Sequence, residues 1–389
     1  MGHLMQNDLK VALVGIGESG CGYVSKIKTD AYPVKKIYID TDARDLGKLG
    51  DVEKLMLSGP AGLGTGWDPQ KGAVAARDNS ERIVELFADT KMVILVSAFG
   101  HGTGSGATPV IARILREQQK FVAAFVTMPF SYDGDVPVAA AREAYSLLSR
   151  ECHFLLRIDC DRLSFFESQG SIVEMYEKPR EWIDCSVQKI FSLLFSSDEN
   201  LRMDFVEFHS FFPVAGAPTL FSIGEGDGAD AIRSALDSLS ACPLIEPQDK
   251  SDTAVVIVSI AAFPTGEQAN LIASGVAKKM GATKRVRLCY DIVPGMGDKI
   301  KLCVIGAIDI KAAENRRKKY LTPTDVTNAM QDSGSFALDY TGEGGLPIDD
   351  RGIFEGVPRL LYEGEDLEVP TYIRRRVNLE KSLKEAQKK

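Results

Sequence analysis

The sequence predicts an α/β fold in which helices accompany a parallel β-sheet. Four short runs of β-branched and other apolar residues alternate with helical stretches between Leu9 and about Asp161, a pattern typical of βαβ units. Each run is apolar on both faces, as buried parallel strands are, and a Gly- or Asp-bearing loop follows it. The predicted strands are residues 10–14, 36–39, 92–97 and 122–127.

A long helix and a second α/β unit follow. Apolar residues from Ile183 to Leu194 recur at helical spacing, and Pro179 suits a first helical turn, so we expect a central core helix that begins at Pro179. Beyond it we expect strands at 253–263, 285–293 and 299–308 and helices at 228–241 and 267–280. The expected divisions are a first domain (9–178), the central helix with its following loop (179–214), a second domain (215–310) and a largely disordered tail (311–389).

Composition argues against several classes of function. The net charge of −8 disfavours a nucleic-acid or anionic-membrane surface as the main partner, because both need clustered Lys and Arg. No apolar run approaches the roughly 18 residues that span a bilayer, so we expect no membrane insertion. The seven cysteines lie far apart and form no metal-binding spacing. They predict free thiols in a reducing compartment, hence a cytoplasmic protein without a metal site of its own.

The first glycine motif, Gly15-Ile-Gly-Glu-Ser-Gly20, follows a predicted strand and precedes a helical stretch. Its backbone N–H groups could cradle phosphates, although a structural turn explains this motif equally well when it is taken alone. Asp40 lies at the end of the next strand, where a dinucleotide-binding fold places its ribose-binding acid. An NAD-dependent enzyme is therefore one alternative.

A second glycine cluster favours a polyphosphate. Residues 99–106 (Phe-Gly-His-Gly-Thr-Gly-Ser-Gly) follow another strand and run through Pro109 into a predicted helix, 110–119. The cluster offers consecutive N–H groups, the hydroxyls of Thr103 and Ser105 and a helix N-terminus, although its glycines could also merely make a tight turn. Because the chain has no GxxxxGK[ST] motif, charge neutralisation would fall to Mg²⁺ and backbone dipoles.

The tubulin/FtsZ family has a signature loop that residues 100–109 resemble. Three more segments resemble nucleotide-contacting loops of FtsZ, in the family's order: 40–43 (Asp-Thr-Asp-Ala), 62–69 (Gly-Leu-Gly-Thr-Gly-Trp-Asp-Pro) and 126–134 (Val-Thr-Met-Pro-Phe-Ser-Tyr-Asp-Gly). Residues 203–208 resemble its catalytic loop, and two short segments match its second domain, Glu225-Gly226 and 295–298. The resemblance covers roughly residues 9–309.

This resemblance implies a Rossmann-like GTPase domain with a parallel sheet, a long central helix, a second α/β domain with a mixed sheet, and a flexible tail. It also implies that GTP or GDP binds together with Mg²⁺, with the phosphates against the glycine motifs and the base facing Glu181. The nucleotide-binding residues it implies are Gly17, Glu18, Ser19, Gly20, Cys21, Asp40, Gly64, Gly100, His101, Gly102, Thr103, Gly104, Ser105, Gly106, Asp133 and Glu181.

The same resemblance implies that the catalytic acids act on a neighbouring subunit. Asp204 and Glu207 match the acids of the FtsZ pattern NxDxxD, and Arg202 stands in place of its Asn. Acids that follow the core helix to the opposite end of the domain would meet the next subunit's GTP, so we expect a head-to-tail filament that hydrolyses GTP at its junctions. Arg202 could reach the neighbour's γ-phosphate or pair with one of the two acids.

The tail contains a short segment, residues 366–374 (Asp-Leu-Glu-Val-Pro-Thr-Tyr-Ile-Arg), that is similar to the C-terminal peptide of FtsZ. In the family this peptide docks on membrane-tethering and regulatory proteins. The resemblance therefore implies binding of cell-division or membrane-tethering adaptors through Leu367, Val369, Pro370, Tyr372, Ile373 and Arg374.

Some positions depart from the family pattern. Gly22 replaces an Asn of the first glycine loop and Pro137 replaces an Arg, whereas Asp133 and Glu181 keep carboxylates where the family contacts ribose and guanine, so we expect guanine over adenine. His101 replaces a glycine and is either a solvated residue or a phosphate contact. Three functions stay open: an FtsZ-like GTPase, a paralogue that assembles with little hydrolysis, and an NAD-dependent enzyme.

Overall fold

The computed structural model describes residues 9–57, 62–166, 171–245, 250–282 and 284–307, together with 361–362 and 365–366 of the tail. The chain separates into two compact units, Met1–Leu321 and Thr322–Lys389. In the second unit the described residues form one antiparallel pair, β11 (Leu361–Tyr362) with β12 (Glu365–Asp366). The predicted adaptor-binding residues, Leu367 to Arg374, lie outside the described residues.

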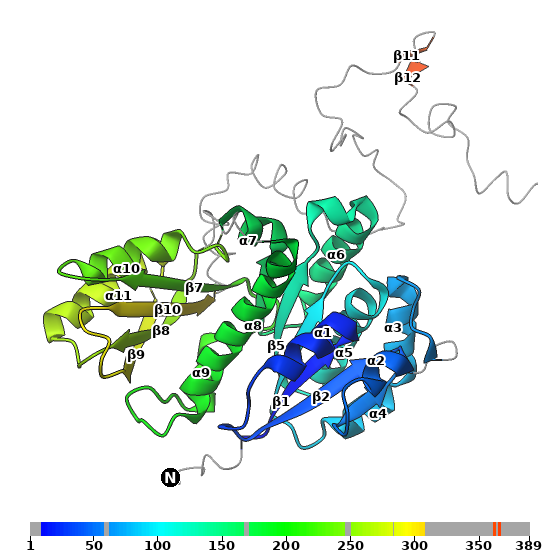
Figure 1. The fold of residues 1–389 in the computed structure, drawn as a ribbon, viewed down its shortest axis with the longest axis horizontal. Coiled ribbons are helices and arrows are strands. Elements are labelled where there is room, and N and C mark those ends of the chain that lie inside the picture. Colours follow the sequence, from blue (N-terminus) through cyan, green and yellow to red (C-terminus); the bar gives the residue numbers. More distant parts are fainter. Residues whose placement is uncertain are drawn as a thin grey trace, which may run out of the picture. The chain divides into compact units, whose positions relative to one another are not determined.

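The first domain is built on a six-stranded sheet that is parallel throughout, as predicted, in the order β3-β2-β1-β4-β5-β6 (Figure 1). The four predicted strands are confirmed. Two edge strands were not predicted, because β3 has only three residues and β6 mixes apolar residues with an Arg and an Asp. The strands are β1 (Val11–Ile16), β2 (Val34–Asp40), β3 (Lys54–Met56), β4 (Met92–Ala98), β5 (Phe121–Met128) and β6 (Phe154–Asp159).

Helices bury both faces of this sheet, which is why its strands are apolar on both sides. Val11 and Leu13 face one core and Ala12 and Val14 face the other, since successive residues of a strand point to opposite faces. The first face packs under α1 (Gly17–Lys26), α2 (Ala43–Gly47), α7 (Cys160–Phe166) and α8. The second packs under α3 (Pro69–Asp78), α4 (Ser80–Leu86), α5 (Gly102–Glu117) and α6 (Asp135–Leu148).

The central helix is α8 (Ile172–Phe195), and it lies between the two domains (Figure 1). It begins seven residues earlier than predicted, because Ser171 and Glu174 form a capping box in which Ser171 N–H donates to Glu174 Oε2 at 2.6 Å. Pro179 therefore lies inside the helix, and the prediction that it occupies the first turn is wrong. With 24 residues, α8 is about 36 Å long.

The second domain has a four-stranded mixed sheet, order β7-β10-β8-β9, in which β10 runs antiparallel to both neighbours and β8 pairs parallel with β9. The mixed sheet implied by the family resemblance is confirmed. Helices α10 (Ala231–Ser240) and α11 (Gly266–Met280) cover one face. The strands are β7 (Thr219–Gly226), β8 (Thr253–Ile260), β9 (Arg285–Ile292) and β10 (Ile300–Ala307).

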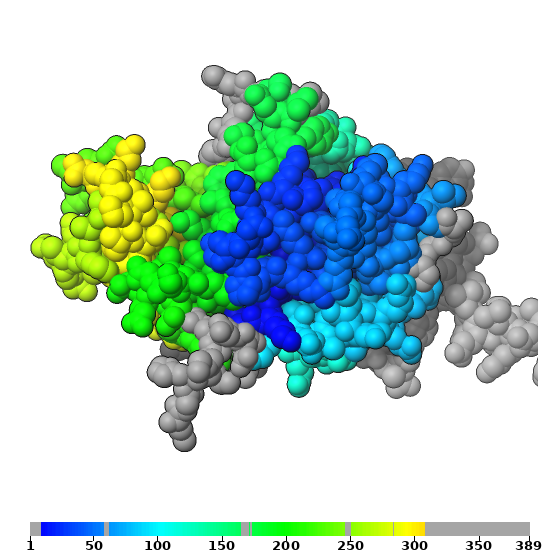
Figure 2. Space-filling model, turned by 60° about the horizontal axis from the view of Figure 1, so that its bottom comes forward, coloured from blue at the N-terminus to red at the C-terminus, as the bar shows by residue number. Residues whose placement is uncertain are grey.

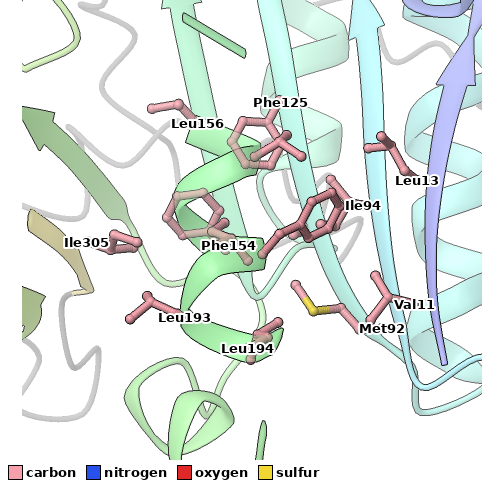
Figure 3. Packing of buried hydrophobic residues seen from close by; sticks show 14 of the residues in the cluster. Val11, Leu13, Met92, Ile94, Phe125, Phe154, Leu156, Leu193, Leu194 and Ile305 are labelled. Carbon is pink, nitrogen blue, oxygen red and sulfur yellow. The ribbon is translucent and has the colours of Figure 1, made fainter. Parts of the chain in front are cut away.

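One core joins the two domains through α8. Figure 3 shows Leu13 and Ile94 of the first sheet, Leu193 of α8 and Ile305 of β10 within the same cluster. A short helix, α9 (Phe205–Phe211), follows α8 and adds Phe208 to this core. All seven cysteines are free, as predicted. Among the described residues, no helix is both long and apolar enough to cross a membrane.

Residues 102–106 of the second glycine cluster form the start of α5, which begins at Gly102, eight residues before the start of the predicted helix 110–119. A Cβ built on Gly102 would lie 1.9 Å from Thr65 Oγ1, one on Gly104 would lie 2.2 Å from the Ala98 carbonyl oxygen, and one on Gly106 would lie 1.9 Å from the Pro69 carbonyl oxygen. None of these three glycines has a positive φ. The glycines therefore allow α5 to lie directly against α3 and β4. This packing role differs from both roles suggested by the sequence, a tight turn and a phosphate cradle.

The close contact of α5 with α3 predicts that Gly106→Ala destabilises the first domain. A methyl group at this position meets backbone atoms, which cannot move aside without displacing α3, so we expect a loss of about 1–3 kcal/mol in the free energy of unfolding. Gly22→Ala is the matched control, since a Cβ there meets nothing within 4 Å and the helix propensity of α1 improves. Urea unfolding measures both variants. Equal midpoints would contradict the packing role of Gly106.

Candidate functional site

Two helix N-termini meet at the carboxyl ends of β1 and β4, where ligands of open α/β sheets bind. Helix α1 begins at Gly17 directly after β1. Gly17 has φ +75°, and a Cβ there would lie 3.3 Å from the backbone nitrogen of Gly104 in the first turn of α5. The unpaired N–H groups of both helices thus border one hollow of about 310 Å³. Such an arrangement favours an anion with several oxygens.

Asp40 closes the inner side of this hollow. It ends β2, is only 3% exposed, and accepts the Thr41 N–H at Oδ1 at 2.6 Å. Its Oδ2 is buried and has no hydrogen-bond partner among the residues that the structure describes. Burial raises the pKa of Asp40 to about 6. The hydroxyl of the next residue, Thr41, lies 2.7 Å from that of Thr103 on α5 and ties the end of β2 to the helix start.

The acids around the hollow do not form a metal cage. Asp42 is paired with Arg44, which donates Nη2 to Oδ2 at 2.8 Å, and this pairing lowers the pKa of Asp42. In the part of the chain that is described, no three His, Cys, Asp or Glu side chains are placed to hold an ion. Magnesium commonly uses one or two carboxylates plus phosphate oxygens and water. The residues therefore fit a cation that arrives with a polyphosphate.

An aromatic pair stands at the outer edge of the hollow. The rings of Trp67 and His101 lie 4.3 Å apart between centroids, tilted by 44°. Trp67 is 68% exposed and has φ +69°, a conformation unusual for a bulky residue. His101 is the N-cap residue of α5. His101 is itself exposed, so the structure leaves both the solvated residue and the phosphate contact open.

A second hollow, of about 280 Å³, adjoins the first and shares Ser19, Trp67, Ala98 and His101 with it. Its other side is aromatic. Tyr176 of α8 meets Phe130 edge-to-face at 5.0 Å and donates its hydroxyl to Asp133 Oδ1 at 3.2 Å. An apolar wall with a few polar groups suits a planar heterocycle. The two hollows together thus match a nucleotide with its phosphates at the helix starts.

The structure brings together most, but not all, of the residues predicted to bind nucleotide. Those that line the hollows are Gly17, Glu18, Ser19, Asp40, Gly64, His101, Gly102, Thr103, Gly104 and Asp133. Those that do not are Gly20, Cys21, Gly100, Ser105, Gly106 and Glu181.

Packing and pairing explain where the second group lies. The Ser105 hydroxyl accepts the Gly100 N–H at 2.8 Å, and the Cys21 thiol donates to the Gly15 carbonyl. Glu181 pairs with Lys178 on the surface of α8. Sequence reasoning missed Phe130, Trp67 and Tyr176. The first two lie within segments that resemble nucleotide-contacting loops, whereas Tyr176 had no signal, because α8 was expected to start after it.

The predicted catalytic residues lie beyond the C-terminal end of α8, whereas Tyr176 and Pro179, near its N-terminal end, line the second hollow. Asp204 caps α9 by accepting the Val206 N–H at 2.7 Å. Glu207 contacts Arg285 and Arg287 of β9 at 3.4 and 3.5 Å. Arg202 lies 4.0 Å from Glu199, and none of the contacts described for the single subunit joins it to Asp204 or Glu207.

The buried carboxyl group of Asp40 predicts a pH-dependent stability of the nucleotide-free protein. Because its pKa is raised from 3.8 to about 6, folding favours the protonated form; that contribution is complete below about pH 4 and is lost as pH rises through 6. The loss amounts to about 2–3 kcal/mol. Asp40→Asn lacks this loss, so its melting temperature relative to the original protein should rise between pH 4 and 7. A difference that is flat with pH would contradict this.

Comparisons with known proteins agree with this geometry. Residues 10–166 match the model of the tubulin/FtsZ family, GTPase domain. Cell division protein FtsZ of Helicobacter pylori is 28% identical over 254 residues, which are 64% of this chain and 66% of that protein. Cell division protein FtsZ of Pseudomonas putida is 26% identical over 302 residues, 76% of this chain and 75% of that protein.

A solved structure shares the fold of both domains. The FtsZ dimer of M. jannaschii superposes with a TM-score of 0.68 and 24% identity, covering 78% of this chain and 89% of that one. The residues matched by the family model contain the strand ends and helix starts that enclose the first hollow. The chain thus shares the fold of this FtsZ over both domains, and its residues 10–166, which carry the first hollow, match the GTPase domain of the tubulin/FtsZ family.

Proposed function

We propose that this protein binds GTP in the two adjoining hollows, assembles head to tail into cytoplasmic filaments, and hydrolyses GTP where subunits meet, in cell division or a related cytoskeletal role. The observation that carries the proposal is the separation of the hollows from the acids Asp204 and Glu207 along α8. Pro179, which lines the second hollow, lies 16 residues or about 24 Å before the last residue of the helix, Phe195, and both acids follow that residue. No single subunit can bring both parts to one phosphate.

The nucleotide would lie across the two hollows. Its phosphates fit the first turns of α1 and α5, whose N–H groups and positive helix ends stabilise negative charge. Its base fits between Phe130, Tyr176 and the Trp67–His101 pair. Magnesium, bound mainly through the phosphates, would neutralise charge that develops at the γ-phosphate. A dinucleotide enzyme is disfavoured, because buried Asp40 bonds to its own backbone.

Exposed apolar residues support assembly through the two ends of α8. Around the hollows, the exposed side chains include Leu63, Trp67, Tyr132, Val136 and Tyr176. Near α9 they include Val206, which is 69% exposed, and Val214. Figure 2 turns the α9 end toward the viewer, with the green surface exposed beside the blue first domain. A contact between two different patches is heterologous, and it builds a filament when it does not close into a ring.

One observation favours a slower relative of FtsZ as the second candidate. Glu207, which would polarise the attacking water, is already paired with two arginines in the single subunit. Arg202 replaces the Asn of the FtsZ pattern. A protein of this kind would bind GTP and assemble but turn over little. In either case the adaptor-binding role of the tail motif, residues 367–374, remains part of the proposal.

Assembly should require GTP. We expect sedimentation or light scattering to report filaments with GTP but not with GDP or ATP, because residues 10–166 match a GTPase domain. Ser19→Phe should impair assembly in all cases: Ser19 is an exposed residue that lines both hollows, so a large side chain there fills the nucleotide space without disturbing the core. Equal pelleting with all three nucleotides, or unimpaired assembly of Ser19→Phe, would refute this.

Glu207→Gln should bind GTP normally and assemble, yet hydrolyse it at least about 10²-fold more slowly, since the variant cannot accept a proton from water. Glu199→Gln is the control, an 87% exposed acid that precedes the same segment. Mixing Glu207→Gln with Ser19→Phe is decisive, because the second variant offers its Glu207 to the GTP of the first. Recovered phosphate release supports the shared site. Mixed filaments with no activity at any ratio would rule it out.

A further inference from the structure

Two arginines from β9 contact the predicted catalytic acid, although they lie far from it in sequence. Arg285 and Arg287 are two residues apart, so their side chains leave the same face of β9. Both point to Glu207 of α9, with nitrogen-to-Oε1 distances of 3.4 and 3.5 Å. These contacts link α9 to the second domain. The acid is therefore flanked by two positive charges.

The two arginines differ in how firmly they are held. Arg285 donates Nη1 to the Ser210 hydroxyl at 2.8 Å and Nη2 to Glu207, and its guanidinium lies 4.0 Å above the Phe211 ring. Three contacts with α9 fix its position. Arg287 touches Glu207 through Nε alone, although the two arginine side chains are equally exposed, at 45%. Within the described residues, its two Nη groups have no hydrogen-bond partner.

Arg202 is less suited to act together with this acid. Its guanidinium is 4.0 Å from Glu199, its backbone N–H donates to the Asp198 carbonyl in the turn after α8, and none of the described contacts joins it to Glu207. Arg287 is therefore the arginine that contacts Glu207 directly and still has both Nη groups available as hydrogen-bond donors. A guanidinium fork matches two oxygens of a phosphate.

We infer that Arg287 supplies positive charge to the γ-phosphate of the neighbouring subunit's GTP, and that Arg285 is a positioning residue that holds α9 and Glu207 in place. This inference rests on the proposed function. In the free subunit, Arg287 and Glu207 neutralise each other. At a junction the phosphate competes for the guanidinium, and Glu207 is released to bind water. Arg287 would thus pair with Glu207 before assembly and with the γ-phosphate after it. This change of partner would make hydrolysis depend on assembly.

The chemical step then uses both released groups. Glu207 accepts a proton from the water whose oxygen bonds to the γ-phosphorus, while the bond from that phosphorus to the β-phosphate oxygen breaks and GDP and phosphate are formed. Arg287 stabilises the charge spread over the γ-phosphate oxygens. Arginines that act from a partner molecule accelerate such transfers by about 10³-fold or more.

The test compares Arg287→Ala and Arg287→Lys with Arg233→Ala, a control arginine of α10 that is exposed elsewhere in the second domain. We expect Arg287→Ala to bind GTP and assemble normally but to lose about 10²-fold or more in phosphate release per filament subunit. Arg287→Lys should recover part of it, and Arg233→Ala should match the original protein. Arg285→Ala should instead lower the melting temperature, because it removes the Phe211 and Ser210 contacts.

Two readouts separate this role from a structural one. GDP with aluminium fluoride, which imitates the transferring phosphate, should pellet the original protein but not Arg287→Ala. A mixture with Ser19→Phe, which retains Arg287, should restore hydrolysis to Arg287→Ala. The assignment is overturned if Arg287→Ala retains full turnover, or if Arg202→Ala loses more than it does. If the original protein neither assembles nor hydrolyses GTP, the proposed function fails and this inference falls with it.

Discussion

The length of one rigid helix governs how this molecule is organised. Helix α8 packs in a single core with both sheets, so its two ends are fixed relative to both domains. The residues that enclose the hollows lie near its first turns, and the candidate catalytic acids follow its last turn. From Pro179, which lines the second hollow, to the end of α8 is about 24 Å, a distance that side-chain movement cannot close. If GTP chemistry needs both parts, it needs two subunits.

Close backbone packing shapes the other half of the site. Glycines at the start of α5 bring this helix against α3 and β4, and this contact places the N–H groups of α5 beside those of α1. The same glycines were predicted to touch phosphate. Only part of that role is compatible with the structure, since Gly102 and Gly104 line the first hollow whereas Gly106 meets α3. Glycine thus lines the ligand site at positions 102 and 104 of α5 and allows close helix packing at position 106.

Sequence periodicity predicted the fold class, and family resemblance predicted the mixed sheet, because both depend on local patterns. Local patterns could not place the start of α8, where a capping box at Ser171 outweighs the signal of Pro179. They also could not join Glu207 to Arg285 and Arg287, because β9 follows α9 only after two other strands and two helices. Contacts of this kind arise from tertiary packing and leave no trace in the spacing of residues.

The dependence of phosphate release on protein concentration tests the shared site most directly. If each active site is built from two subunits, the rate per subunit is near zero at low concentration with saturating GTP. It then rises steeply above the concentration at which filaments form and levels off. That threshold should coincide with the onset of light scattering. A rate per subunit that stays constant from nanomolar to micromolar protein would show that one chain suffices, and it would contradict the account.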